Sequence, residues 1–144
     1  MTTSSIPPRI MIVDDDQVSV MSMQRQIRKA DPAIPIDVAH DGQQALDMLS
    51  AELARIGRLP PVVVTLDLNM PRMSGLEFLG AVRDHPVLRR LVVFVFTTSD
   101  SERDVQAAFG LNAAGYVLKE SGQERFVGGL RMLAQFAHSS RLPA

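Results

Sequence analysis

Five short apolar runs lie along the chain, and they constrain its fold more than any other feature. They are rich in β-branched residues, and most lack the alternation of apolar and polar residues that is expected for a strand with one face in water. Runs of this kind are typical of strands that are buried on both faces. They occupy residues 9–13, 36–39, 62–66, 91–96 and 116–118.

Between these runs, apolar residues recur every three or four positions, which predicts helices with one apolar face. Asp41 with Gly42, and Ser74 with Gly75, are helix-start signals. The alternation of strands and helices predicts right-handed crossovers and a parallel sheet with helices on both faces. The expected fold is a doubly wound α/β domain, in which five helices flank a five-stranded parallel sheet.

The chain has 144 residues, the usual size of one domain. We expect this domain at residues 9–138, between flexible tails at 1–8 and 139–144. The chain has no Cys, which removes thiol chemistry, and its net charge of -1 offers no general attraction for nucleic acid. No apolar run approaches the ~18 residues of a membrane span. These features favour a soluble, cytoplasmic protein with no nucleic-acid or membrane partner.

Polar residues directly follow four of the five runs. Three aspartates at 14–16 follow the first run, Asp67 follows the third, and Thr97 and Lys119 follow the fourth and fifth. A carboxylate beside a buried strand is costly, so it needs a partner or a function. Doubly wound sheets bind ligands beyond the carboxyl ends of their strands. We therefore expect these residues to converge on one site.

Several carboxylates in one pocket repel one another, by about 4 kcal/mol for a pair ~4 Å apart at an effective dielectric near 20. A cation is needed to keep them ionised, and a site of oxygen ligands favours Mg²⁺. A carboxylate in such a site can attack a phosphoryl group, while Lys119 and Thr97 supply charge and a hydrogen bond to the phosphoryl oxygens. The residue types predict phosphoryl transfer to an aspartate.

Four motifs, VDDD, LDLNMPRMSG, VFTTS and YVLK, occur in this order between residues 9 and 138. With them the chain resembles the receiver domain of bacterial response regulators, in the stand-alone form found in chemotaxis regulators. The resemblance implies a flavodoxin-like strand order, 2-1-3-4-5. It also implies a phosphoprotein that acts as a switch in two-component phosphorelay signalling. Such a protein is not an enzyme, beyond catalysing its own phosphorylation and dephosphorylation.

The resemblance also implies roles for the acidic residues and their neighbour. Asp67 resembles the phosphoacceptor, which forms the aspartyl phosphate. Asp15 resembles the direct ligand of Mg²⁺, and Asp14 the acid that acts through bound water. Asn69 would contribute its main-chain carbonyl to the ion. The implied magnesium site therefore comprises Asp14, Asp15, Asp67 and Asn69.

Three further residues match the family's switch and its cation. Thr97 resembles the hydroxyl that rotates to meet the phosphoryl group, Tyr116 the aromatic residue that turns inward after it, and Lys119 the cation of the pocket. One residue departs from the pattern, because Glu120 stands where the family usually has a proline after a cis bond. A cis bond before a non-proline residue costs ~3 kcal/mol, so the sequence leaves the conformation of this bond open.

The same resemblance implies the partners. A phosphohistidine of a sensor histidine kinase would donate the phosphoryl group, and a downstream protein target or a phosphotransfer protein would contact the face that carries the fourth helix, fifth strand and fifth helix. Residues TTS at 97–99 and the long segment before Pro60 resemble regulators paired with phytochrome-type kinases. The sequence does not decide whether the chain forms a homodimer.

Three alternatives compete with parts of this interpretation. Asp16 is better explained as the N-cap of the first helix than as a metal ligand. The spacing Asp-x-Asp-x-Val also resembles haloacid dehalogenase-type phosphatases, with Asp14 as nucleophile and Asp16 as general acid, but the later acidic motif of such enzymes is missing. The third alternative is a degenerate receiver that is never phosphorylated and acts as a binding module. The presence of Asp67, Thr97 and Lys119 together argues against it.

Overall fold

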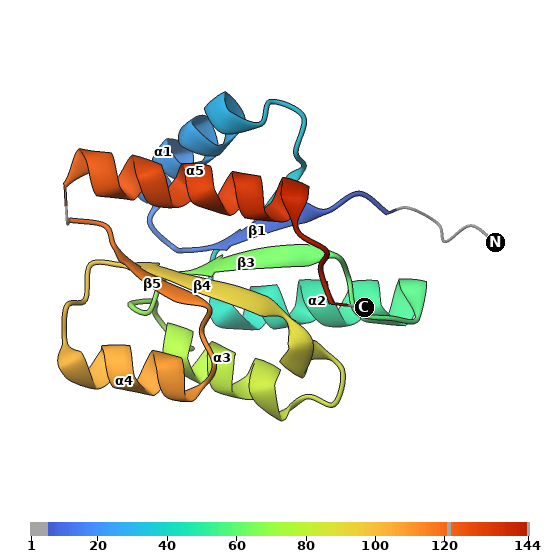
Figure 1. Cartoon of the computed structure of the whole chain (residues 1–144). Coiled ribbons are helices and arrows are strands. Elements are labelled where there is room, and N and C mark those ends of the chain that lie inside the picture. Colours follow the sequence, from blue (N-terminus) through green and yellow to red (C-terminus); the bar gives the residue numbers. More distant parts are fainter. Residues whose placement is uncertain (1–5, 121, 144) are drawn as a thin grey trace.

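The computed structural model describes residues 6–120 and 122–143, which form a five-stranded parallel sheet between two layers of helices (Figure 1). The strand order is β2-β1-β3-β4-β5, so the predicted doubly wound fold is confirmed. The elements are β1 (Arg9–Val13), α1 (Gln17–Ala30), β2 (Ile36–Ala39), α2 (Gly42–Ile56), β3 (Val62–Leu66), α3 (Gly75–Asp84), the 3₁₀ helix η1 (Leu88–Arg90), β4 (Val92–Thr97), α4 (Glu102–Gly110), β5 (Gly115–Leu118) and α5 (Gln123–Ser139).

Two apolar layers bury the sheet. Helices α1 and α5 cover one face, and α2, α3 and α4 cover the other (Figure 1). Successive residues of β1 face opposite layers, with Ile10 and Ile12 in the first layer and Met11 and Val13 in the second. All four are almost completely buried. This explains why the strands lack an alternating pattern, since both faces of the sheet are dry.

The predicted bounds hold for β1, β2 and β3 and shift by one residue for the last two strands. Strand β4 lies one residue later than predicted, because the amide of Leu91 donates to the carbonyl of Leu88 and closes η1. Its last residue is therefore Thr97. Strand β5 begins one residue earlier than predicted, because Gly115 pairs with Phe94.

Both predicted helix starts are confirmed, with Asp41 capping α2 and Ser74 capping α3. Ser74 and Glu77 form a reciprocal capping box, which satisfies two main-chain amides. A Cβ atom on Gly75 would lie only 2.3 Å from the carbonyl oxygen of Asp67. A glycine is needed there because the chain after β3 passes directly against the first turn of α3.

The ends of the described chain stay close to the domain. Helix α5 runs to Ser139, and Leu142 beyond it packs against the core. Residues 1–5 and 144 lie outside the described residues, so the flexible tails remain predictions. Within the described residues, no helix combines the length and apolar character needed to cross a bilayer.

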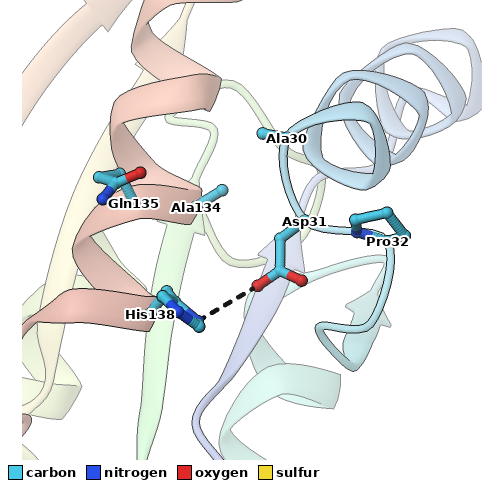
Figure 2. A pocket seen from close by; sticks show the side chains of 6 residues that line it. All are labelled: Ala30, Asp31, Pro32, Ala134, Gln135 and His138. Carbon is cyan, nitrogen blue, oxygen red and sulfur yellow. Dashed lines mark ion pairs between the residues drawn. The ribbon is translucent and has the colours of Figure 1, made fainter.

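A hollow of about 180 Å³ lies between the ends of α1 and α5 (Figure 2). Both helices end at the edge of the sheet opposite to Asp67. His138 Nδ1 lies 3.8 Å from Asp31 Oδ2 across this hollow, a loose ion pair with an exposed histidine. None of the predicted site residues is among its lining residues, which are Ala30, Asp31, Pro32, Ala134, Gln135 and His138.

Candidate functional site

Main-chain hydrogen bonds continue past the strands and position the predicted site residues. The amide of Asp67 donates to the carbonyl of Val13 at 3.0 Å, and the amide of Lys119 donates to the carbonyl of Thr97 at 2.8 Å. Asp14 is bonded in the same way to the end of β2. The sheet therefore places side chains from four separate chain segments at one edge, as the sequence predicted.

Three carboxylates meet at this edge. Asp14, Asp15 and Asp67 each offer an oxygen atom, and these atoms all lie within 4.8 Å of one another. Asp14 and Asp67 are buried, with 2% and 7% of their surface exposed, whereas Asp15 is exposed. We call these three residues the acidic trio. Their mutual repulsion is strong because two of the three charges are shielded from water.

Lys119 is the cation of the acidic trio. Its ammonium Nζ lies 2.6 Å from Asp14 Oδ2 and 3.5 Å from Asp67 Oδ2. The lysine side chain is 9% exposed, so the short ion pair is largely shielded from water. Among the residues that the structure describes, one ammonium thus faces three carboxylates, and it cannot balance their charge.

Asp14 is held more tightly than the other acids. Its Oδ1 accepts a hydrogen bond from the amide of Asp16 at 2.9 Å, and its Oδ2 accepts from Lys119. Burial raises the pKa of the Asp14 carboxyl, and the bonds from Lys119 and Asp16 offset only part of this effect. Burial thus disfavours the ionised carboxylate, and an added positive charge beside Asp14 would favour it.

Asp67 is held more loosely. Its Oδ1 accepts from the amide of Asn69 at 3.2 Å, and its nearest cation is Lys119 at 3.5 Å. The Asn69 side chain contacts the residue after β4, with Nδ2 3.5 Å from Thr98 Oγ1. The predicted role of the Asn69 main-chain carbonyl in metal binding stays a prediction.

Thr97 and Tyr116, the two predicted switch residues, both contact Ser99. Thr97 is completely buried, and its Oγ1 accepts from the amide of Ser99 at 3.4 Å. The Tyr116 hydroxyl donates to the carbonyl of Ser99 at 2.8 Å. Burial raises the pKa of Tyr116, so the phenol stays a hydrogen-bond donor at neutral pH.

Ser99 also binds the start of α4, a contact that the sequence motifs did not reveal. Its hydroxyl donates to Asp104 Oδ2 at 2.6 Å. Asp104 lies in the first turn of α4, after its N-cap Ser101. No sequence pattern marks this bond, because a serine followed five residues later by an aspartate is common in loops before helices.

Two open points near the site are settled by geometry. Asp16 caps α1 by accepting from the amide of Val18 at 3.1 Å, as predicted, and it is not a member of the acidic trio. The bond between Lys119 and Glu120 is trans, since no described peptide bond is cis. The loop therefore positions Lys119 without the cis proline that the family usually has.

The acidic trio fits a hard divalent cation. Its ligands are carboxylate oxygens alone, and two of them are buried beside a single ammonium group. Mg²⁺ prefers oxygen ligands and keeps several waters, which the exposed side of Asp15 permits. A divalent ion would supply the positive charge that Lys119 leaves missing.

Comparison with known proteins agrees with this geometry. The family model described as "Response regulator receiver domain" matches residues 10–131. The nitrate/nitrite response regulator NarL of Escherichia coli is 31% identical over 128 residues, which cover 89% of this chain and 55% of NarL. This chain thus spans about half the length of that relative.

Two similar proteins match over most of their length. Response regulator Rcp1 of Synechocystis is 30% identical over 83% of this chain and 82% of Rcp1. The crystal structure of the phosphorylated cyanobacterial phytochrome response regulator RcpA has a TM-score of 0.82 at 25% identity and covers 96% of this chain and 99% of RcpA. Nothing in these comparisons supports a haloacid dehalogenase-type phosphatase. The chain belongs to the response regulator receiver domains, the signalling switches of two-component systems, which bind Mg²⁺ in an acidic pocket and interact with sensor histidine kinases.

Proposed function

We propose that Asp67 accepts the phosphoryl group that this receiver obtains from the phosphohistidine of a sensor histidine kinase. The observation that carries the proposal is the difference between the two buried acids of the trio. Both oxygens of Asp14 accept short hydrogen bonds, of 2.9 and 2.6 Å. The shortest contacts of Asp67 are 3.2 and 3.5 Å, which leave its lone pairs available for attack on phosphorus.

Asp14, Asp15 and Asp67, together with the main-chain carbonyl of Asn69, would hold Mg²⁺. When bound, the ion supplies positive charge that offsets the carboxylates and attracts the phosphoryl oxygens. This assignment is supported by the gathering of three carboxylates beside the ammonium of Lys119, because a divalent cation would offset their mutual repulsion.

In the transfer, an Asp67 oxygen forms a bond to phosphorus as the bond between phosphorus and the histidine nitrogen breaks. The electron pair of that bond stays on the nitrogen. Lys119 places its ammonium 3.5 Å from Asp67 Oδ2, where it offsets the charge that the phosphoryl group brings. The buried hydroxyl of Thr97 would supply a hydrogen bond to the same group after rotating from the amide of Ser99.

The output would be a protein contact. The phosphoryl group on Asp67 would compete with the amide of Ser99 for the hydroxyl of Thr97. Ser99 joins Thr97 to Tyr116. The face carrying α4, β5 and α5 would then change its affinity for a downstream target or a phosphotransfer protein in the cytoplasm. Similarity to RcpA, described as a phytochrome response regulator, supports a phytochrome-type kinase as donor.

Intact mass spectrometry tests the phosphoacceptor. We expect the wild-type chain to gain one phosphoryl group when incubated with acetyl phosphate and Mg²⁺, and Asp67→Asn to gain none. Asp16→Asn is the matched control, because it changes a neighbouring acid that caps α1 and is not part of the trio. This control variant should gain the group as the wild type does.

The same preparations separate the competing functions. A wild-type chain that gains no phosphoryl mass would contradict the proposal and favour the degenerate receiver that acts only as a binding module. Hydrolysis of a phosphate monoester that persists in Asp67→Asn and stops in Asp16→Asn would instead support a phosphatase.

A further inference from the structure

Arg83, near the end of α3, binds four main-chain carbonyls. Its Nε donates to the Leu111 carbonyl at 2.7 Å and its Nη2 to the Asn112 carbonyl at 3.0 Å. Its Nη1 donates to the carbonyls of Arg89 and Leu91 at 2.7 and 2.8 Å. One guanidinium group therefore joins the end of α3 to η1, to the start of β4 and to the end of α4.

These bonds hold the carboxyl end of α4. Leu111 is the C-cap of this helix, and Asn112 follows it in the left-handed conformation, with φ of 59°. Carbonyls at the end of a helix lack partners within it and carry partial negative charge, which the guanidinium satisfies. A lysine could not replace Arg83 here, because an ammonium group lacks the planar fork that reaches several acceptors at once.

The amino end of α4 is attached differently. Its N-cap Ser101 accepts from the amide of Asp104 at 3.4 Å, a long bond, and Asp104 accepts the 2.6 Å bond from the Ser99 hydroxyl. Ser99 in turn reaches Thr97 through a bond of 3.4 Å. This end therefore depends on a chain of side-chain contacts that leads to Thr97, and two of them, between Ser99 and Thr97 and between Asp104 and Ser101, are long and therefore weak.

We infer that Arg83 is a positioning residue that makes the carboxyl end of α4 a fixed pivot, about which the amino end of the helix turns when Asp67 is phosphorylated. The inference rests on the proposed function, since the motion begins with Thr97 leaving Ser99 for the phosphoryl group. The four bonds to Arg83 resist displacement at one end of α4, while the two 3.4 Å bonds at the other end, from Ser99 to Thr97 and from Asp104 to Ser101, yield.

The absence of cysteine makes the motion measurable, since spin labels attach only at introduced cysteines. Ser50 lies exposed on α2 and serves as the reference. One double variant carries Ser50→Cys with Glu102→Cys at the amino end of α4, and the other carries Ser50→Cys with Gly110→Cys at the carboxyl end. A Cβ atom at Gly110 meets no atom within 4 Å, so this label is accommodated. Label distances are measured by pulsed electron paramagnetic resonance.

We expect beryllofluoride with Mg²⁺, a mimic of the phosphoryl group, to shift the distance to residue 102 by on the order of 2 Å and to leave the distance to residue 110 unchanged. In Arg83→Lys, the distance to residue 110 should shift or broaden as well. Arg103→Lys is the matched control, because this exposed arginine lies on α4 itself. The control should behave as the wild type does.

The pivot is wrong if beryllofluoride moves both ends of α4 equally in the wild type, if it moves neither, or if Arg83→Lys keeps the wild-type pattern. A parallel incubation with acetyl phosphate and Mg²⁺, followed by intact mass spectrometry, measures phosphorylation separately. A labelled chain that gains the phosphoryl group without the expected pattern refutes the pivot alone, whereas a chain that gains no mass refutes the proposed function on which the pivot rests.

Discussion

The two edges of the sheet both contain buried charges, but only one edge balances them. At the amino edge, Arg9 pairs with Asp37 at 2.7 Å and with Glu52, and Arg55 adds a second contact to Glu52 at 3.4 Å. Two cations thus face two anions. At the carboxyl edge, the three carboxylates of the acidic trio face the single ammonium of Lys119.

This difference separates a structural cluster from a functional one. A balanced cluster satisfies its own charges and joins β1, β2 and α2. An unbalanced cluster is costly in the isolated chain, and the cost falls only when a cation or another charged group binds. Removing a positive charge should therefore affect phosphorylation at the carboxyl edge and stability at the amino edge.

Lys119→Met gives the largest expected effect. Without the ammonium, the charge of the incoming phosphoryl group is no longer offset, and we expect the rate of phosphoryl gain from acetyl phosphate to fall by about 10²- to 10³-fold. A time course of intact mass in the presence of Mg²⁺ measures this rate. Arg131→Met, on the exposed side of α5, is the control and should keep the wild-type rate. A Lys119→Met rate within twofold of the wild type would remove Lys119 from the site.

Arg9→Met should produce the converse result. It leaves Glu52 and the partly exposed Asp37 without their shared partner, and we expect a loss of about 1–2 kcal/mol of unfolding free energy, below the ~3 kcal/mol of a fully buried pair. Urea unfolding measures this loss, while the rate of phosphoryl gain should stay unchanged. Arg55→Met, whose side chain is 70% exposed, is the control and should cost under ~1 kcal/mol. A loss for Arg9→Met as small as that of the control would show that the amino edge is not a structural cluster.

The carboxyl edge could be predicted from the sequence because its information is local. Each site residue follows a recognisable apolar run, and parallel strands bring such positions to one edge. The order of the strands was therefore enough to predict that four residues lie together, namely Asp14, Asp15, Asp67 and Lys119. The start of β4 was misplaced by one residue because Leu91 is as apolar as its neighbours, and only its bond to η1 sets it apart.

The contacts of Arg9 and Arg83 had no comparable signal. Arg9 begins an apolar run, where an arginine is ordinarily solvated, and its partner Glu52 is far away in the sequence. Arg83 binds main-chain carbonyls, which every residue possesses, so the identity of its partners is not encoded in side chains. Such contacts follow from how the helices pack, and they become visible only in three dimensions.

Asp14→Asn should have the smallest effect, and its sign depends on pH. Burial raises the pKa of Asp14 in the folded chain, so the fold binds more protons than the unfolded chain above about pH 4. Stability therefore falls as pH rises through the folded pKa. Without Mg²⁺ at pH 7, the neutral amide should stabilise the chain by on the order of 1 kcal/mol, and this gain should vanish as the pH falls towards about 4. Urea unfolding at several pH values measures both.

Mg²⁺ should make the wild type more stable than Asp14→Asn, because the ion stabilises the fold only through carboxylates that it binds. At a concentration near 100 times its dissociation constant, the wild type should gain about 2.7 kcal/mol, and Asp14→Asn clearly less. Arg9→Met, with its acidic trio intact, should gain as much as the wild type. If Asp14→Asn is the less stable protein at pH 7 without the ion, the ion pair between Asp14 and Lys119 outweighs the repulsion. The carboxyl edge would then be balanced in the same sense as the amino edge, and the contrast between them would not mark function.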